Sequence, residues 1–333
     1  MYLDLTHTKD IYKAIRSNII SDQQVVMILV AENSQIDLLA LIKEFNKEGI
    51  QFFGGVFPGL IYNNEKLDKG LIFKVLPVLF SPFLIRDIDK DNQEIPALRK
   101  ILNKSGQQRN TAIVLIDGQT PNVAGFLAKL CSELGGEVDY FGGGAGSLTV
   151  RQPCIFSNEG LLQNAAIVGF INRNVALGVG HGLPELKGPM ISTKTTSNCG
   201  HETTIENKEV LEYDTCVHLP YDIADKDLES KPTNQSEAEL LLIDGAKHAA
   251  MESLKKGDQP PVDYLVIDSV SRVLFLNERF DEELQMVDVQ LRKSESSASV
   301  EGILSIGEIT SCQEGKLTLF NGKILVGSFY EDA

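Results

Sequence analysis

The sequence predicts an α/β fold in which helices flank mixed sheets, built from three related units in two domains. Two observations support this prediction. A pattern of strand, helix, strand and hairpin occurs three times along the 333 residues. The helix of each copy also has one apolar face, which needs a sheet to cover it. Because internal repetition is the signature of a repeated architecture, we expect equivalent loops to occupy equivalent places.

Each unit opens with an apolar run that predicts a buried strand, and a helix follows. The predicted first strands are 25–30, 112–116 and 264–267. The helices after them have apolar residues at helical spacing over 36–45, 123–134 and 276–291. A further helical segment is expected before each unit, at 9–20, 94–102 and 237–254.

The second half of each unit predicts one further crossover strand and a hairpin. The second strand carries glycine in every copy, at Gly54-Gly55, at 142–144 and at Gly307. A strand–helix–strand segment of this length favours parallel pairing. Asparagine turns at 61–65, 155–160 and 319–322 then predict antiparallel hairpins, most strongly at Asn321-Gly322, because that pair tolerates positive φ. Closing strands are expected at 70–76, 165–171 and 323–330.

An insertion of about residues 172–236 separates the second unit from the third. It contains a candidate strand at 175–179 and a polar stretch at 222–236. We place a domain boundary near residue 185. The first domain, 1–185, then holds two units, and the second, 186–333, holds the insertion and the third unit.

Composition excludes several classes of protein. A net charge of −15 argues against nucleic-acid binding, which needs clustered Lys and Arg. No apolar stretch reaches the ~20 residues of a membrane span. Five cysteines without framework spacing and an N-terminus without signal-peptide features predict a cytoplasmic protein. The serines Ser147, Ser269 and Ser271 have no identifiable catalytic partner, so an enzyme is the least favoured class.

The glycine-rich segment 141–147 has two interpretations. Its backbone N–H groups are of a type that closes on a phosphate. However, Gly-Lys-Ser/Thr is absent and the residues after it look extended. A tight bend at a strand end is the favoured interpretation, and it is compatible with a backbone that lines a ligand.

Arg272 lies in the turn between the first strand and the helix of the third unit. Its planar guanidinium suits a carboxylate or another small anion. The alternative is a salt bridge with a nearby acid such as Glu308, and the two interpretations have similar weight.

Histidines and cysteines after the second unit suggest weaker possibilities. His181 stands between two glycines, which suits either an axial haem ligand or an exposed turn. Two Cys-x-His pairs, Cys199 with His201 and Cys216 with His218, could together supply four ligands to a zinc ion. Their spacing is unusual for a structural zinc site, so ordinary packing of strand residues is the favoured interpretation.

Several of these motifs, in this order, resemble the FIST family. They are 141–147, His181-Gly182-x-Pro184, 268–276, 307–309 and 319–321. The resemblance runs through most of the chain and covers both the N-terminal and the C-terminal FIST regions. The segment around Arg272, taken together with Gly307-Glu308-Ile309 and Asn321, is its most specific part.

The resemblance implies a bacterial sensory protein of signal transduction that binds a small ligand, such as an amino acid or an anion. It would regulate a separate partner, such as a histidine kinase or a cyclic-dinucleotide enzyme. We expect no cofactor. The alternative is a haem protein that senses nitric oxide, with His181 as the axial ligand.

The predicted ligand site uses strand-end loops of the second and third units. Arg272 would anchor an anion, Glu308 would orient it or accept an ammonium group, and Asn321 would supply an amide. The backbone at Gly143, Gly144, Ala145 and Ser147 would line the wall. Asp268 and Ser269 stand where many family members carry a cysteine, so the ligand is expected to differ.

Overall fold

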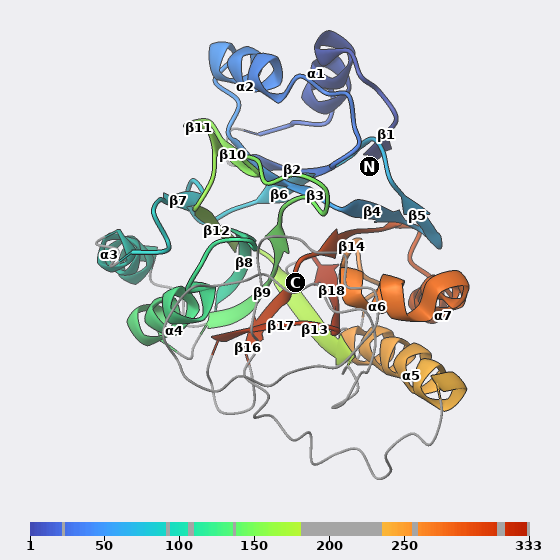
Figure 1. The fold of residues 1–333 in the computed structure, drawn as a ribbon. Coiled ribbons are helices and arrows are strands. Elements are labelled where there is room, and N and C mark those ends of the chain that lie inside the picture. The colour runs from blue at the N-terminus through green and yellow to red at the C-terminus, as the bar shows by residue number, and fades with distance from the viewer. Residues whose placement is uncertain are drawn as a thin grey trace.

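The computed structural model describes residues 1–21, 24–90, 94–105, 110–135, 138–180, 235–254, 259–311 and 317–331. Within these ranges the strands form three six-stranded sheets, each containing parallel and antiparallel pairs. The sheets face a common centre, and the helices lie outside them (Figure 1). The predicted α/β fold class is confirmed.

The first two units have the same succession of elements. The first comprises β1 (Tyr2–Leu3), α1 (Thr8–Arg16), β2 (Gln24–Ala31), α2 (Leu38–Lys47), β3 (Phe52–Phe57), β4 (Gly59–Tyr62), β5 (Glu65–Leu67) and β6 (Leu71–Pro77). The second comprises β7 (Phe83–Ile85), α3 (Ile95–Ser105), β8 (Asn110–Asp117), α4 (Val123–Leu134), β9 (Val138–Ala145), β10 (Ile155–Ser157), β11 (Gly160–Leu162) and β12 (Ala166–Ile171).

The third unit repeats this succession, with its second helix broken in two. It comprises β13 (Asn174–Gly180), α5 (Gln235–Ser253), β14 (Asp263–Ser269), α6 (Val270–Leu276), α7 (Phe280–Leu291), β15 (Val300–Ser305), β16 (Glu308–Ser311), β17 (Leu317–Phe320) and β18 (Ile324–Tyr330). Strand β13 pairs with β18 as β1 pairs with β6 and β7 with β12. The predicted strand at 175–179 is therefore the opening strand of this unit.

Each hairpin joins the sheet of a different unit. The β4–β5 hairpin of the first unit pairs with β15, the β10–β11 hairpin of the second pairs with β3, and the β16–β17 hairpin of the third pairs with β9. The three units exchange hairpins in a closed cycle. The predicted domain boundary near residue 185 lies outside the described residues, and the sheet that contains β14 and β15 takes strands from both sides of it.

Glycine allows the parallel strands to approach one another at the same place in every unit. Gly54, Gly142 and Gly302 lie opposite Ile28, Val114 and Val266 in equivalent registers. A Cβ on Gly142 would come within 1.8 Å of the Val114 carbonyl oxygen. The expected equivalence of Gly307 was wrong: Gly302 is the third-unit counterpart, and Gly307 lies after β15 with a φ of +105°.

The predicted bend at 142–144 was also wrong, because these glycines lie inside β9. Among the asparagine turns, Asn63 and Asn158 do connect hairpin strands. Asn321-Gly322 does not: it links β17 to β18, which belong to different sheets. The two strands around this pair do not form a hairpin, since β17 pairs with β16, which in turn pairs with β9 of the second unit.

The core follows from this arrangement. The largest cluster fills the centre and takes side chains from all three sheets, including Ile28, Phe141, Ile267 and Phe329. Separate clusters lie between α3, α4 and one sheet, and between α5, α6, α7 and another. The three sheets are thus apolar on both faces, which explains their continuous hydrophobic runs.

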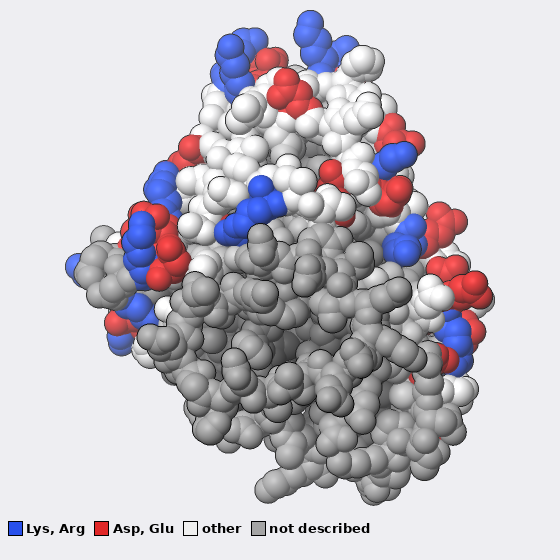
Figure 2. Space-filling model, viewed as in Figure 1, with Lys and Arg blue, Asp and Glu red and all other residues white. Residues whose placement is uncertain are grey.

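Two surface properties complete the description. In the described part of the chain, no helix is both long enough and apolar enough to cross a membrane. Figure 2 shows basic and acidic side chains next to one another around the described part of one face.

Candidate functional site

Polar side chains converge where β14 ends, at the edge of the core between α6, α7 and the loop that connects β17 to β18. We call Asp268, Ser269, Arg272, Glu283 and Glu308 the buried cluster, because none of these side chains is exposed. Such a concentration of charge inside a core needs internal partners, since water cannot solvate it.

Ser269 fixes the local backbone at the end of β14. It is the N-cap of α6, and its hydroxyl accepts a hydrogen bond from the Ser271 N–H at 3.3 Å. The same oxygen accepts one from the Gly322 N–H at 2.9 Å, and the hydroxyl donates to Asn321 Oδ1 at 3.1 Å. The Ser271 hydroxyl also donates to Asn321 Oδ1. One serine therefore ties the β17–β18 loop to the start of α6.

Arg272 is the cation of the buried cluster. Its Nε donates to Glu283 Oε1 at 3.0 Å and its Nη2 donates to Glu283 Oε2, which makes a bidentate pair. Nη2 also donates to the Leu242 carbonyl at 2.7 Å, and Nη1 to the Gly322 carbonyl at 3.2 Å. The guanidinium is thus occupied by α7, α5 and the loop. Its predicted role as a direct anion anchor stays a prediction, and binding an anion there would compete with Glu283.

Glu308 joins the cluster from β16. Its carboxyl contacts the Ser305 hydroxyl at 2.7 Å and the Lys323 N–H at 3.0 Å. Burial raises the pKa of Glu308 to about 8. At neutral pH this group therefore holds a proton in the folded protein.

Asp268 is the most unusual member. Its Oδ1 accepts from the Ser269 N–H at 2.8 Å and lies 3.4 Å from Arg272 Nε. Its Oδ2 has no hydrogen-bond partner among the described residues. Burial, followed by the negative charge of Glu283, raises the pKa of Asp268 well above its ordinary value. A buried carboxyl oxygen without a partner is rare in folded proteins.

Three half-buried residues, Ser271, Asn321 and Lys323, form the outer edge of the cluster, and we call them the rim. Asn321 accepts two hydroxyl hydrogen bonds through its oxygen. Its amide nitrogen donates to none of the described residues. The Lys323 ammonium lies over the Phe320 ring, 3.7 Å from its centroid.

The structure brings together most of the predicted site. Arg272, Glu308 and Asn321 meet in the cluster and its rim, and Gly143 lies directly opposite Glu308 in the β9–β16 pair. Gly144 is taken up by sheet contacts, since its N–H donates to the Gly307 carbonyl at 2.8 Å.

Ala145 and Ser147 face the junction of the first and second units instead. The Ala145 carbonyl accepts from the Gly118 N–H at 2.9 Å. The Ser147 hydroxyl accepts from the N–H groups of Thr149 and Val150, at 3.1 and 3.2 Å. In the described part of the chain, neither residue forms a hydrogen bond with Arg272, Glu308 or Asn321.

The second unit has a simpler counterpart of the cluster. Asp117 occupies the place of Ser269, and its Oδ2 accepts from the Asn164 N–H at 2.8 Å, as Ser269 accepts from Gly322. Arg151 neutralises it at 3.1 Å. Because this carboxylate is fully paired, the excess of acid groups is a property of the third unit.

Sequence reasoning missed Asp268 and Glu283 as members of the site. Glu283 had a signal: it lies on the apolar face of α7 with Phe280, Leu284 and Val287, at helical spacing. A charged residue on such a face needs a buried partner. Asp268 had only its place at a strand end, four residues before Arg272.

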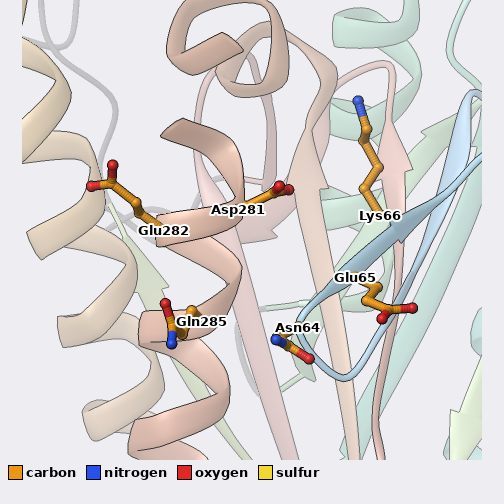
Figure 3. Close-up of a pocket in the computed structure, with 6 residues that line it drawn as sticks. All are labelled: Asn64, Glu65, Lys66, Asp281, Glu282 and Gln285. Carbon is orange, nitrogen blue, oxygen red and sulfur yellow. The ribbon is translucent and has the colours of Figure 1, made fainter. Parts of the chain in front are cut away.

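A surface groove lies between α7 and the β4–β5 hairpin (Figure 3). It has a volume of about 450 Å³ and is lined by Asn64, Glu65, Lys66, Asp281, Glu282 and Gln285. Asp281 points towards the hairpin, whereas Glu282 points away from it and pairs with Arg279 at 2.8 Å. The groove contains none of the predicted site residues and has no buried polar group that awaits a ligand.

The remaining predicted residues lie outside the described part of the chain. They are His181, Cys199, His201, Cys216 and His218. Within the described ranges, no group of three or more histidine, cysteine or acidic residues is arranged to hold a metal. The haem and zinc alternatives stay predictions.

Comparison with known proteins gives one family. The model of the FIST N domain matches residues 14–202, more than half of the chain. A search of curated proteins finds no match. The C-terminal FIST region, which the motifs around Arg272 and Glu308 predicted, lies beyond the matched residues.

Proposed function

This chain belongs to the FIST family, whose domains are small-ligand sensory domains of signalling proteins, and we propose that it senses an amino-acid-like ligand through the buried cluster and its rim. The ligand would approach past the rim, at Ser271, Asn321 and Lys323. Its arrival would change the contacts of the β17–β18 loop and shift the population of conformers.

One observation carries this proposal: charged and amide groups from five separate elements converge on one loop. Asp268, Arg272, Glu283, Glu308 and Asn321 come from β14, α6, α7, β16 and the β17–β18 loop. Ser269 and Ser271 hold the Asn321 amide with its oxygen turned towards α6. An Asn amide nitrogen with no described partner suits a ligand carboxylate, and buried acids suit an ammonium group.

The roles follow from this geometry. Asn321 would contact the ligand through its amide nitrogen, and Glu308 would orient the loop through the Lys323 N–H. Arg272 would act chiefly as a positioning residue, because Glu283 already holds its guanidinium. If a ligand anion displaced Glu283, Arg272 would instead bind that anion directly, as the sequence predicted.

The test is thermal unfolding of the protein with each of the common amino acids and with small organic acids. We expect an amino acid to raise the Tm of the wild type, and the rise to be lost in Asn321→Ala. The matched control is Asn64→Ala, which removes an exposed asparagine from the β4–β5 turn. Equal shifts in all three proteins would refute a site at the rim, and no shift with any compound would refute amino-acid sensing.

The signalling partner is proposed at the level of the family alone. A cytoplasmic histidine kinase or cyclic-dinucleotide enzyme would receive the signal. A pull-down repeated with and without the stabilising amino acid tests this, since a sensor should show ligand-dependent association.

A further inference from the structure

The buried cluster contains more acid than base. Three carboxyl groups, those of Asp268, Glu283 and Glu308, surround the single guanidinium of Arg272. The bidentate contact assigns that guanidinium to Glu283. The one positive charge near Asp268 among the described residues is Arg272, whose Nε lies 3.4 Å from Asp268 Oδ1. Glu308 contacts the hydroxyls of Ser305 and Ser269 and the Lys323 N–H. Since Glu308 holds a proton at neutral pH and Arg272 is paired with Glu283, one more positive charge beside Asp268 would favour ionisation of the Asp268 carboxyl.

Asp268 Oδ2 shows where that charge would bind. Asp268 is fully buried, yet this oxygen has no described partner. An uncompensated buried acceptor costs free energy, which a donor with positive charge would recover. The equivalent strand end of the second unit shows the contrast, because Arg151 contacts both oxygens of Asp117 there, at 3.3 and 3.1 Å.

We propose that Asp268 binds the protonated amino group of the ligand, and that the site therefore selects primary amines over acids. This inference rests on the proposed function and gives it a ligand class. In an amino acid, the ammonium group would reach Asp268 while the carboxylate stays at the rim, near the Asn321 amide. Asp268 is a ligand-binding residue that the sequence did not indicate.

Binding of a cation here should release a proton. The groups that face Asp268 are Arg272 from α6, Glu283 from α7 and Glu308 from β16. Burial and the two acids raise the pKa of Asp268, so before the ligand arrives its carboxyl keeps a proton to higher pH than an ordinary aspartate does. An adjacent ammonium group favours the carboxylate, so the proton leaves to solvent on binding. Affinity should then rise with pH, by up to about tenfold per pH unit, while Asp268 is protonated in the free protein and the amine is charged.

The experiment compares three forms of the amino acid that stabilises the protein most: the free amino acid, its carboxamide and its N-acetyl derivative. Isothermal titration calorimetry gives the affinity of each. The carboxamide keeps the ammonium group and the N-acetyl form keeps the carboxylate. We expect the free amino acid and the carboxamide to bind, and the N-acetyl form to lose at least about tenfold in affinity.

Asp268→Asn is the decisive variant, because the amide is close in shape to the protonated carboxyl and should leave the fold intact. It should weaken binding of the free amino acid and the carboxamide by about 10- to 100-fold. Titration in phosphate and in Tris at the same pH should show proton release in the wild type and less in this variant. Asp281→Asn, the same change at an exposed position of α7, should alter neither quantity.

The outcomes separate the two proposals. If an amino acid binds but its N-acetyl form binds equally well, or if Asp268→Asn keeps full affinity with a native Tm, the inference is wrong and the sensor remains. If Asp268→Asn does not fold, the affinities of the wild type for the three ligand forms still test whether the site requires a free ammonium group. If none of the amino acids or carboxamides binds, both proposals are wrong.

Discussion

Arg272 connects four parts of the third unit through one side chain. Besides its own helix, α6, it bonds Glu283 of α7, the Leu242 carbonyl of α5 and the Gly322 carbonyl of the β17–β18 loop. A buried ion pair adds modest net stability when intact, but removal of one partner leaves an uncompensated charge. The intact pair therefore adds little net stability, whereas loss of Arg272 alone should be costly.

Arg272→Met should lower the free energy of unfolding by about 3–5 kcal/mol, because Glu283 is left buried without its cation. Urea denaturation followed by far-UV circular dichroism measures it. The control is Arg279→Met, which breaks more exposed ion pairs with Glu239 and Glu282 and should lower the free energy of unfolding much less, because solvent screens these pairs. A loss in Arg272→Met no larger than in the control would contradict this account, and Glu283→Gln added to Arg272→Met should recover part of the loss.

Glu308 should make stability fall as pH rises. Its folded pKa of about 8 lies above the ordinary 4.5, so between these values the folded state holds a proton that the unfolded state has lost. The free energy of unfolding then decreases with pH, by up to about 1.4 kcal/mol per unit for one proton. Glu308→Gln should reduce the slope of the free energy of unfolding against pH, measured by urea denaturation between pH 5 and pH 8, by up to this amount. The glutamine amide can still form hydrogen bonds with the Ser305 hydroxyl and the Lys323 N–H.

The exposed Glu278→Gln is the control for that measurement and should leave the slope unchanged. Asp268 adds to the slope in the same direction, because its pKa is raised too. A wild-type stability that rises across this pH range would show that Glu308 is ionised in the folded protein.

At the scale of elements, the repeated glycine is a requirement of strand spacing. Gly54, Gly142 and Gly302 each face a carbonyl oxygen of the neighbouring parallel strand, and a Cβ would lie 1.9, 1.8 and 2.2 Å from it. The sequence predicted glycine-bearing strands but aligned the third copy wrongly, at Gly307. The strand register decides between Gly302 and Gly307, and register depends on partners that are distant in the sequence.

Gly142→Ala should destabilise the protein by about 3 kcal/mol or more, because the backbone of β8 would have to move. Gly302→Ala should act in the same way. Gly135→Ala is the control: it has open space around it, so it should cost only the backbone strain of its φ of +87° and ψ of 172°, roughly 1–3 kcal/mol. Thermal or urea unfolding of the three variants decides, and equal losses throughout would contradict a packing role for these glycines.

At the scale of the whole molecule, exchange of hairpins makes the three units depend on one another. Without the third unit, β9 would lose β16 as its neighbour, and the β4–β5 hairpin would have no sheet to join. The central core would also lose Ile267 and Phe329. Among the strands that the structure describes, each sheet includes a hairpin from another unit.

We therefore expect the full chain to unfold in one cooperative transition. Far-UV circular dichroism and tyrosine fluorescence should give coincident urea curves. The fragment 1–185, expressed alone, should lack the dispersed NMR spectrum of a folded domain, because it exposes the edge of β9 and part of the central core. Two separate transitions, or a well-folded fragment, would establish independent domains at the boundary predicted from the sequence.

The sequence by itself determined the unit: its apolar runs, amphipathic helices and closing strands are local patterns, so all three copies were found with their order intact. It also predicted that Arg272, Glu308 and Asn321 lie near one another, as they do. Only the tertiary structure decided which sheet each hairpin joins, because the local pattern of a short hairpin does not specify its partner edge, which is distant in the sequence. Because the β16–β17 hairpin pairs with β9, Asn321 lies in a connection between two sheets instead of in a hairpin turn. The same pairing places Glu308 beside Asp268, in a cluster that no local sequence pattern specifies.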